Sequence, residues 1–227
     1  YANRILAPYL NEVMLMIEEG GEIVKLDRAM KKKGMPVGPI ALMDEVGIDV
    51  GAHVMSGDIS QIVKSREGVA VSEGLLKMYD AGYLGKKNKK GYYKYDGKNG
   101  KRNGANPEAY KFFGNPAKKE ISFEDMTWRP LLLMINEAVM CLEEGIILTP
   151  TDGDLGAVFG LGFLPFTGGP FRFVDSFGAK EMVNLMREYE QKIGPKFRPR
   201  PKLVELAEGN LKFHSSDANS KTSKLED

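Results

Sequence analysis

The sequence is poor in the residues that build metal centres and disulfides: it has one cysteine, Cys141, and two histidines, His53 and His214. A single cysteine excludes an internal disulfide and is typical of a reducing compartment. The histidines are far apart in the chain, with no carboxylate at ligand spacing, so no metal site is expected. Cys141 lies within an apolar helical pattern, which predicts a buried and inert thiol rather than a nucleophile.

Long apolar runs and an excess of one charge are also missing. No run of about 18 apolar residues occurs, so no membrane-spanning helix is expected. The 32 basic and 31 acidic residues leave a formal net charge of +1, and no nucleic-acid partner is expected. Residues 160–169 are glycine-rich, but they follow no predicted strand and lack the Gly-Lys-Ser or Gly-Lys-Thr of a phosphate loop. The residues alone therefore show no cofactor-binding motif and no self-contained active site.

What the sequence does contain is a duplication. Residues 4–13 (Arg-Ile-Leu-Ala-Pro-Tyr-Leu-Asn-Glu-Val) return as residues 129–138 (Arg-Pro-Leu-Leu-Leu-Met-Ile-Asn-Glu-Ala), at an offset of 125. A second anchor, residues 38–47, returns at residues 169–178 with an offset of 131. Two copies at so long a period indicate a duplicated domain and not a solenoid.

Helical periodicity dominates both copies. Apolar residues recur at three- and four-residue spacing over residues 3–19 and 125–144, which predicts a long amphipathic helix at the start of each copy. Strand-like alternation is absent from the first 80 residues. Shorter helices are expected over residues 26–32, 40–46, 50–64, 69–81, 178–193 and 202–206. We therefore expect an all-α fold of two tandem, duplicated helical domains.

Composition sets the expected boundaries. The first helical domain is predicted over residues 1–102 and the second over residues 121–213, with a linker rich in turn formers at 103–120. Residues 214–227 are rich in Ser, Asp, Asn and Lys, which predicts a disordered tail. Because the chain begins with Tyr1 inside a helical pattern, we expect it to be part of a longer polypeptide.

Basic residues gather near the end of the first domain. Residues 85–102 contain eight of them against one acid, Asp96, with tyrosines interspersed. A solvated loop is the simpler interpretation. The alternative is contact with anionic groups, such as the surface of an acidic membrane, through Lys86, Lys87, Lys89 and Lys90.

Three polar positions stand out in the duplicated helices. Asn11-Glu12 and Asn136-Glu137 occupy matching places, which predicts a shared structural role, such as hydrogen bonds to a loop or a neighbouring helix. Asn3 stands at the start of the first helix, and its counterpart is Trp128. Two roles are open for Asn3: an N-cap, or an amide that donates to a substrate or catalytic group just beyond the helix.

These segments resemble a known family. Residues 3–12, with Gly-Pro-Ile-Ala-Leu-Met-Asp at 38–44, resemble the C-terminal helical domain of 3-hydroxyacyl-CoA dehydrogenases. Residues 154–175 are similar to the second copy of that domain in multifunctional fatty-acid β-oxidation proteins. The runs at 44–50 and 136–142 are most similar to the alpha subunits of mitochondrial trifunctional enzymes.

The resemblance implies that a longer parent oxidises 3-hydroxyacyl-CoA to 3-ketoacyl-CoA with NAD, and that it also carries an enoyl-CoA hydratase domain. NAD, the catalytic histidine and the catalytic glutamate would belong to a Rossmann domain that this chain lacks, so the chain alone is expected to be inactive. Asn3 is the one dehydrogenase site residue that maps onto this chain. The family places it beside the catalytic histidine and the 3-oxygen of the substrate.

Further expectations follow from the same resemblance. The substrate is an acyl-CoA, the partner a thiolase (beta) subunit, and the location the mitochondrial matrix or inner membrane, with the peroxisome or bacterial cytoplasm as alternatives. The helical part is implied to close the substrate cleft, and its second copy to replace the dimer partner of single-function dehydrogenases. The alternative function is a non-catalytic helical module that docks on a partner subunit or a membrane surface.

Overall fold

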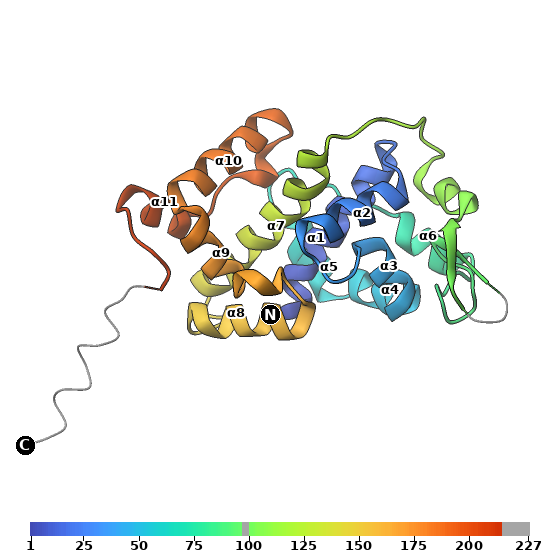
Figure 1. Ribbon diagram of the computed structural model, residues 1–227, viewed down its shortest axis with the longest axis horizontal. Helices are drawn as coiled ribbons and strands as arrows, with labels where there is room; N and C mark the ends of the chain where they lie inside the picture. The colour runs from blue at the N-terminus through green and yellow to red at the C-terminus, as the bar shows by residue number, and fades with distance from the viewer. Residues whose placement is uncertain (97–99, 215–227) are drawn as a thin grey trace, which may run out of the picture.

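The computed structural model describes residues 1–96 and 100–214 and consists mainly of helices (Figure 1). The first half contains α1 (Ala2–Glu18), α2 (Ile23–Lys33), α3 (Pro39–Val46), α4 (Ile48–Ser56), α5 (Asp58–Lys64), α6 (Gly74–Asp80), β1 (Tyr93–Tyr95), β2 (Arg102–Ala105) and the 3₁₀ helix η1 (Pro107–Phe113). The second half contains α7 (Phe123–Glu143), α8 (Pro150–Leu161), η2 (Pro165–Thr167), α9 (Pro170–Phe177), α10 (Ala179–Lys192), η3 (Pro195–Phe197) and α11 (Pro201–Glu208). The predicted helical fold is confirmed, since the strands within these ranges form one antiparallel hairpin.

Local sequence explains where several helices begin. Pro39 and Pro170 open α3 and α9, at the first helical position, where the missing N–H of proline is harmless. The Ser122 hydroxyl caps α7 by accepting a hydrogen bond from the Asp125 N–H at 3.0 Å. A capping box between Thr149 and Asp152 starts α8. These starts depend on neighbouring residues only, and the helices expected over residues 40–46 and 125–144 correspond to α3 and α7.

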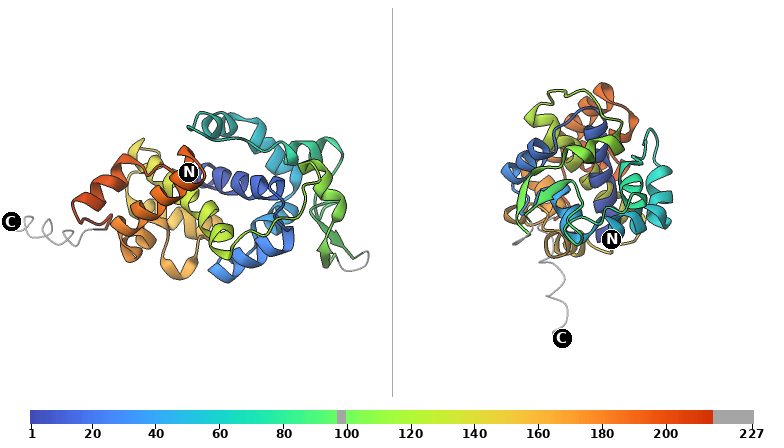
Figure 2. Two further views of the ribbon diagram at one scale, coloured as in Figure 1. Left: turned by 90° about the horizontal axis from the view of Figure 1, so that it is seen from above. Right: turned by 90° about the vertical axis from the view of Figure 1, so that its right-hand side faces the viewer.

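The long helices α1 and α7 pack against each other through the middle of the molecule (Figures 1 and 2). One hydrophobic core surrounds the rest of α1 with α2 to α6, and the other surrounds α7 with α8 to α11. The second core also includes Ile5 and Tyr9 of α1, together with Met30 and Met35. The apolar stripe of α1 is broad because both cores use it.

The connection between the halves is shorter than the sequence predicts. The first part of the expected linker, residues 103–120, forms the end of the hairpin and η1. Phe113 is 5 % exposed, and the Tyr110 hydroxyl accepts a hydrogen bond from the Ile23 N–H at 3.0 Å. These contacts fix the segment on the first half and leave residues 115–121 as the irregular connection.

The expected tail, residues 214–227, lies outside the described residues from 215 onward. His214 itself is held in place: its Nδ1 lies 2.8 Å from Asp175 Oδ2, and its Nε2 lies 3.2 Å from Asp154 Oδ2. The second half therefore extends to His214, one residue beyond the predicted boundary.

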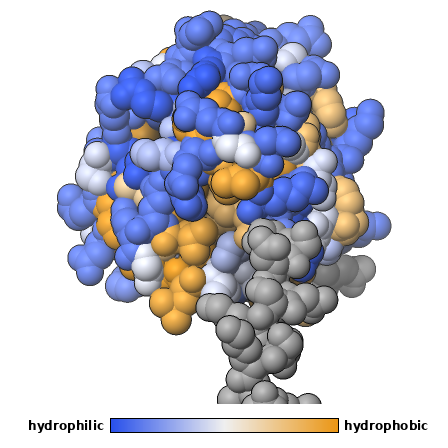
Figure 3. All heavy atoms as spheres, turned by 90° about the vertical axis from the view of Figure 1, so that its left-hand side faces the viewer, coloured by the Kyte–Doolittle hydropathy of each residue, from blue (hydrophilic) through white to orange (hydrophobic). Residues whose placement is uncertain are grey.

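The end of the molecule built by the second half is mostly hydrophilic, with apolar residues gathered toward its lower edge (Figure 3). The most exposed large apolar side chains of the described residues are Leu148, Phe159 and Phe166. Among the helices described, none combines the length and apolarity that crossing a membrane requires.

Candidate functional site

Two buried arginines tie α1 to α7 in the same way. The ion pairs are Arg4–Glu137, Arg4–Glu144, Arg129–Glu12 and Arg129–Glu19, with N···O distances of 2.6 to 2.7 Å. Residues that are 125 positions apart correspond in the two copies. The two pairs made by Arg4 therefore correspond to the two pairs made by Arg129. Such a reciprocal contact is isologous, as between two copies related by a two-fold axis. The halves therefore face each other as two subunits of a dimer would.

Two equivalent asparagines hold extended segments against the long helices. The Asn11 amide donates to the Ala70 carbonyl at 2.8 Å and accepts from the Ser72 N–H at 3.0 Å. Asn136 makes the same two bonds to the backbone of residues 198–200, at 2.7 and 3.0 Å. The shared structural role predicted for these asparagines is confirmed.

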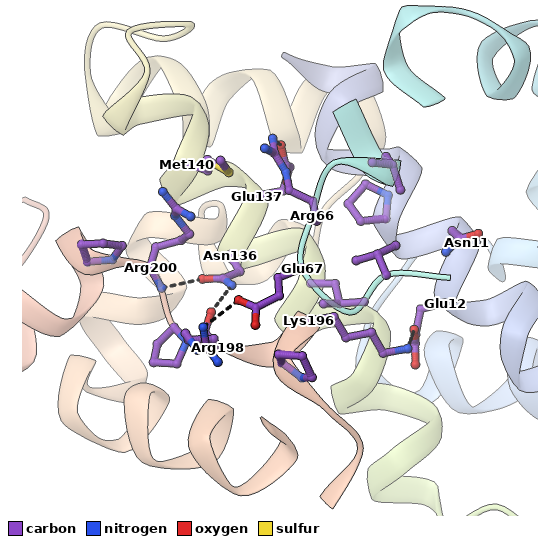
Figure 4. Close-up of a pocket in the computed structure, with 17 residues that line it drawn as sticks. Asn11, Glu12, Arg66, Glu67, Asn136, Glu137, Met140, Lys196, Arg198 and Arg200 are labelled. Atoms are coloured by element: carbon purple, nitrogen blue, oxygen red, sulfur yellow. Dashed lines mark hydrogen bonds and ion pairs between the residues drawn. The ribbon is translucent and has the colours of Figure 1, made fainter. Parts of the chain in front are cut away.

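A cavity of about 270 Å³ lies between the halves beside these contacts (Figure 4). Every charged side chain on its wall has a partner of opposite charge in the protein. Those pairs are Arg66–Glu137, Lys196–Glu12, Arg198–Glu67 and Arg200–Glu143. The charges on this wall are therefore matched within the protein, and the cavity lies in the interface between the halves.

Asn3 lies elsewhere, at an apolar cleft of about 110 Å³ in the first half. The N-cap of α1 is Tyr1, which makes no side-chain capping bond, and Asn3 is already inside the helix. The N-cap hypothesis for Asn3 is therefore wrong. Its side chain is exposed, so the amide is accessible at the start of α1.

The cleft beside Asn3 is formed by α1, α3, α4 and α6. Apart from Asn3 its walls are apolar: Leu6, Ala7, Leu10, Met14, Leu42, Met43, Val46, Gly47, Val50, Gly51, Val54, Met55 and Leu75. Gly51 gives room to Met43, since a Cβ there would lie 2.2 Å from the Met43 methyl. An apolar cleft with one amide suits an alkyl chain attached to a polar group.

An aromatic cluster occupies the equivalent place in the second half. Trp128, the counterpart of Asn3, stacks on Phe173 with ring centroids 6.2 Å apart, and Phe177 lies 5.3 Å from it. The Lys33 ammonium lies 3.7 Å from the centre of the Trp128 ring, a cation–π contact. Burial lowers the pKa of Lys33. Among the described residues, the first half thus has an amide beside an apolar cleft where the second half has an aromatic ring.

Buried aspartates hold the first residues of α3, which borders the cleft, and of α9, which carries part of the aromatic cluster. Asp27 accepts from the first backbone N–H groups of α3, and Asp154 does the same for α9. Burial raises the pKa of both carboxyls, against the opposing effect of the backbone hydrogen bonds. The Tyr93 hydroxyl donates a hydrogen bond to Asp27 at 2.6 Å. In the second half the corresponding neighbour of Asp154 is His214, whose Nε2 lies 3.2 Å from Asp154 Oδ2. The sequence does not reveal this parallel, because Asp27 and Asp154 are 127 residues apart, which matches neither the offset of 125 nor that of 131.

The remaining candidate residues do not join a site. Cys141 is fully buried, and burial raises the pKa of its thiol to about 11. The predicted burial of Cys141 is therefore confirmed, and a raised pKa favours the protonated thiol at neutral pH. His53 is exposed on α4.

Comparison with known proteins defines the class. The profile of the family described as 3-hydroxyacyl-CoA dehydrogenase, C-terminal domain, matches residues 1–95. The first half, which contains the cleft and Asn3, therefore matches the C-terminal domain of 3-hydroxyacyl-CoA dehydrogenases.

Relatives extend the match over both halves. The chain is 41 % identical over 216 residues to the fatty acid oxidation complex subunit alpha of Vibrio vulnificus, covering 95 % of this chain and 30 % of that protein. The subunit alpha of Shewanella loihica is 43 % identical over 216 residues, covering 94 % of this chain and 30 % of that protein. The chain thus matches fatty acid oxidation complex alpha subunits and spans about a third of their length. These relatives are bacterial and give the expected mitochondrial location no support.

Two solved structures share the fold. A 3-hydroxybutyryl-CoA dehydrogenase from Escherichia coli has a TM-score of 0.71 at 18 % identity, covering 92 % of this chain and 60 % of its own. The dehydrogenase part of multifunctional enzyme 1 from C. elegans has a TM-score of 0.66 at 23 % identity, covering 89 % of this chain and 46 % of its own. At such identities the likeness concerns the fold alone.

Proposed function

We propose that this chain is the helical part of a longer enzyme that oxidises 3-hydroxyacyl-CoA to 3-ketoacyl-CoA with NAD and also carries enoyl-CoA hydratase activity. The observation that carries the proposal is the place of Asn3. It is exposed and lines an apolar cleft, in the half that matches the dehydrogenase domain. The cleft would receive the acyl chain, and the Asn3 amide would donate to the 3-oxygen or orient the catalytic base.

The described residues do not fit NAD. Their strands form one antiparallel hairpin, whereas dinucleotides bind at the carboxyl ends of a parallel sheet. NAD would therefore be bound by another part of the longer enzyme, and no step of hydride transfer falls to this chain. When bound there, NAD would accept the hydride from the 3-carbon of the substrate.

Substitution of Asn3 tests the proposal. Because Asn3 is exposed and caps nothing, Asn3→Ala and Asn3→Asp should change the free energy of unfolding by no more than about 0.5 kcal/mol. In the longer enzyme each should lower kcat at least tenfold, which corresponds to about 1.4 kcal/mol in the barrier. Steady-state rates at saturating 3-hydroxyacyl-CoA and NAD measure this.

A matched control is Asn103→Asp, at an exposed position on the hairpin, which should leave kcat unchanged. Full activity of both Asn3 variants would remove Asn3 from the reaction. The chain alone should neither bind NAD nor oxidise the substrate. Calorimetric titration showing micromolar NAD affinity would contradict that expectation.

A partner subunit is also proposed. The relatives are named as subunits of a complex, and the family resemblance favours a thiolase (beta) subunit. Membrane contact through Lys86, Lys87, Lys89 and Lys90 has weaker support, because Lys87 Nζ is paired with Asp49 at 2.8 Å. The bacterial relatives favour the bacterial cytoplasm over the mitochondrion as the location.

The second candidate is a helical docking module without a catalytic role. The apolar cleft is the observation against it, because a purely structural module has no need of an open cleft beside an accessible amide. Loss of turnover in the Asn3 variants, with the complex still assembled, would separate the two functions.

A further inference from the structure

Because the domain is duplicated, the cleft of the first half can be compared with the equivalent place in the second half. In the first half, Leu42 and Val46 of α3 line the cleft beside Asn3. At the offset of 131 residues their counterparts on α9 are Phe173 and Phe177. The first half therefore carries two aliphatic side chains where the second half carries two aromatic rings.

The framework behind these side chains is the same in both halves. Asp27 and Asp154 hold the starts of α3 and α9 through the same backbone N–H groups. Both helices end at a glycine of positive φ, Gly47 at +115° and Gly178 at +103°. The difference between the halves thus lies in the side chains and not in the backbone.

In the second half, larger side chains fill the equivalent space. Phe173 and Phe177 lie 5.8 Å apart between ring centroids, and both contact Trp128. Leu132 and Met182, which replace Ala7 and Gly51, are 1 % and 0 % exposed. Smaller residues stand at two positions, where valines replace Met14 and Met43.

In the second half larger side chains occupy the equivalent place, where Phe177 remains 36 % exposed, whereas the first half has a cleft of about 110 Å³ there. An open apolar cleft loses the dispersion contacts and burial that packing provides. Val46 and Val50 are 48 % and 43 % exposed, so apolar surface also continues out of the cleft. Under the proposed function this surface is suited to an acyl chain.

We propose that Leu42 and Val46 are specificity-determining residues, which set the length of acyl chain that the cleft beside Asn3 admits. This inference rests on the proposed function. The aliphatic side chains leave the cleft open toward the exposed apolar surface at Val46 and Val50, and we expect aromatic residues at positions 42 and 46 to narrow it.

The test transfers the aromatic residues of the second half into the first. Leu42→Phe, Val46→Phe and the double variant are made in the longer enzyme that carries this chain. Values of kcat/KM are measured with 3-hydroxyacyl-CoA substrates of 4 and 16 carbons. The ratio of the 16-carbon to the 4-carbon value should fall at least tenfold in the double variant.

A control and a second pair of variants complete the test. Phe177→Leu changes the second half and should leave the ratio within twofold of the parent. Leu42→Ala and Val46→Ala widen the cleft and should shift the ratio at least threefold toward the 16-carbon substrate. Thermal unfolding shows which variants are folded, and the alanine variants decide the question if the phenylalanine variants do not fold.

The outcomes separate the two claims. An unchanged ratio in folded Leu42 and Val46 variants of an active enzyme would overturn the inference and leave the proposed function standing. A parent enzyme that oxidises no 3-hydroxyacyl-CoA of any length would overturn both.

Discussion

Glu12 shows how a single residue depends on the other half of the molecule. It has no exposed surface, and its carboxylate is paired with both Arg129 and Lys196. Its counterpart Glu137 is paired with Arg4 and Arg66 in the same way. A carboxylate removed from water needs such partners, because the desolvation penalty is otherwise not offset.

Arg129→Met should therefore destabilise the protein strongly. It leaves the buried carboxylate of Glu12 with one cation instead of two, and breaking a buried pair typically costs about 3 to 5 kcal/mol. Urea unfolding at neutral pH measures the change.

Arg198→Met is the matched control, because that arginine is largely exposed and its ion pairs lie at the surface. It should cost less than about 1 kcal/mol. Similar losses in the two variants would show that burial does not govern the Arg129 pair.

At the scale of elements, the asparagine bonds connect segments that have little regular structure to the long helices. Asn136 holds residues 198–200, which lie between η3 and α11. Asn11 holds residues 70–72, which precede α6. Each amide satisfies backbone groups that no strand or helix satisfies, so these extended segments depend on one side chain each.

Asn136→Leu should loosen residues 198–200 and leave residues 70–72 in place. The two backbone groups are only partly buried, so leaving them without partners should cost no more than about 1 to 3 kcal/mol, the cost for fully buried groups. Hydrogen exchange should accelerate at the Arg200 amide and stay slow at the Ser72 amide, and Asn11→Leu should give the reverse. Faster exchange at both amides in either variant would indicate general unfolding instead.

At the scale of the whole molecule, the halves are not independent. Ile5 and Tyr9 of α1 are buried in the core of the second half, and the reciprocal ion pairs join α1 to α7. Separating the halves would expose this apolar surface and leave the buried charges without partners.

Residues 1–120 and 121–227, produced as separate chains, should therefore be much less stable than the intact protein. Circular dichroism should show reduced helicity in each, and mixing them should restore helicity and a cooperative thermal transition. The idea is wrong if either half alone unfolds cooperatively at the temperature of the intact chain.

Acid should weaken the contact between the halves. Hydrogen bonds from Arg129 and Arg4 lower the pKa of Glu19 and Glu144 below their usual 4.5. A carboxyl with a lowered folded pKa contributes stability that is fully present above pH 4.5 and is lost as the pH falls through the lowered value.

The double variant Glu19→Gln with Glu144→Gln should therefore lose less stability between pH 7 and pH 3 than the parent. Urea unfolding at pH 7, 5 and 3 measures the slope of stability against pH. Equal slopes in the two proteins would show that these carboxyls do not govern the acid response.

The sequence by itself determined the helical class, the duplication and most helix starts. Apolar periodicity, the proline at the first position of α3 and the caps of α7 and α8 act between residues a few positions apart. The duplication is visible because Arg4, Asn11 and Glu12 return at one fixed offset. The structural role of the asparagines followed from that offset, although their partners did not.

Only the tertiary structure decided which distant side chains meet. Glu12 and Lys196 are 184 residues apart in the chain, and no local pattern pairs them. Asn3 could be read as a cap from the sequence, but α1 starts at Ala2, which leaves the amide accessible beside the cleft. Leu42 and Val46 line a cleft in the first half, whereas at the equivalent place of the second half Trp128, Phe173 and Phe177 pack against one another. Such packing depends on several helices at once, and the sequence of one helix does not contain it.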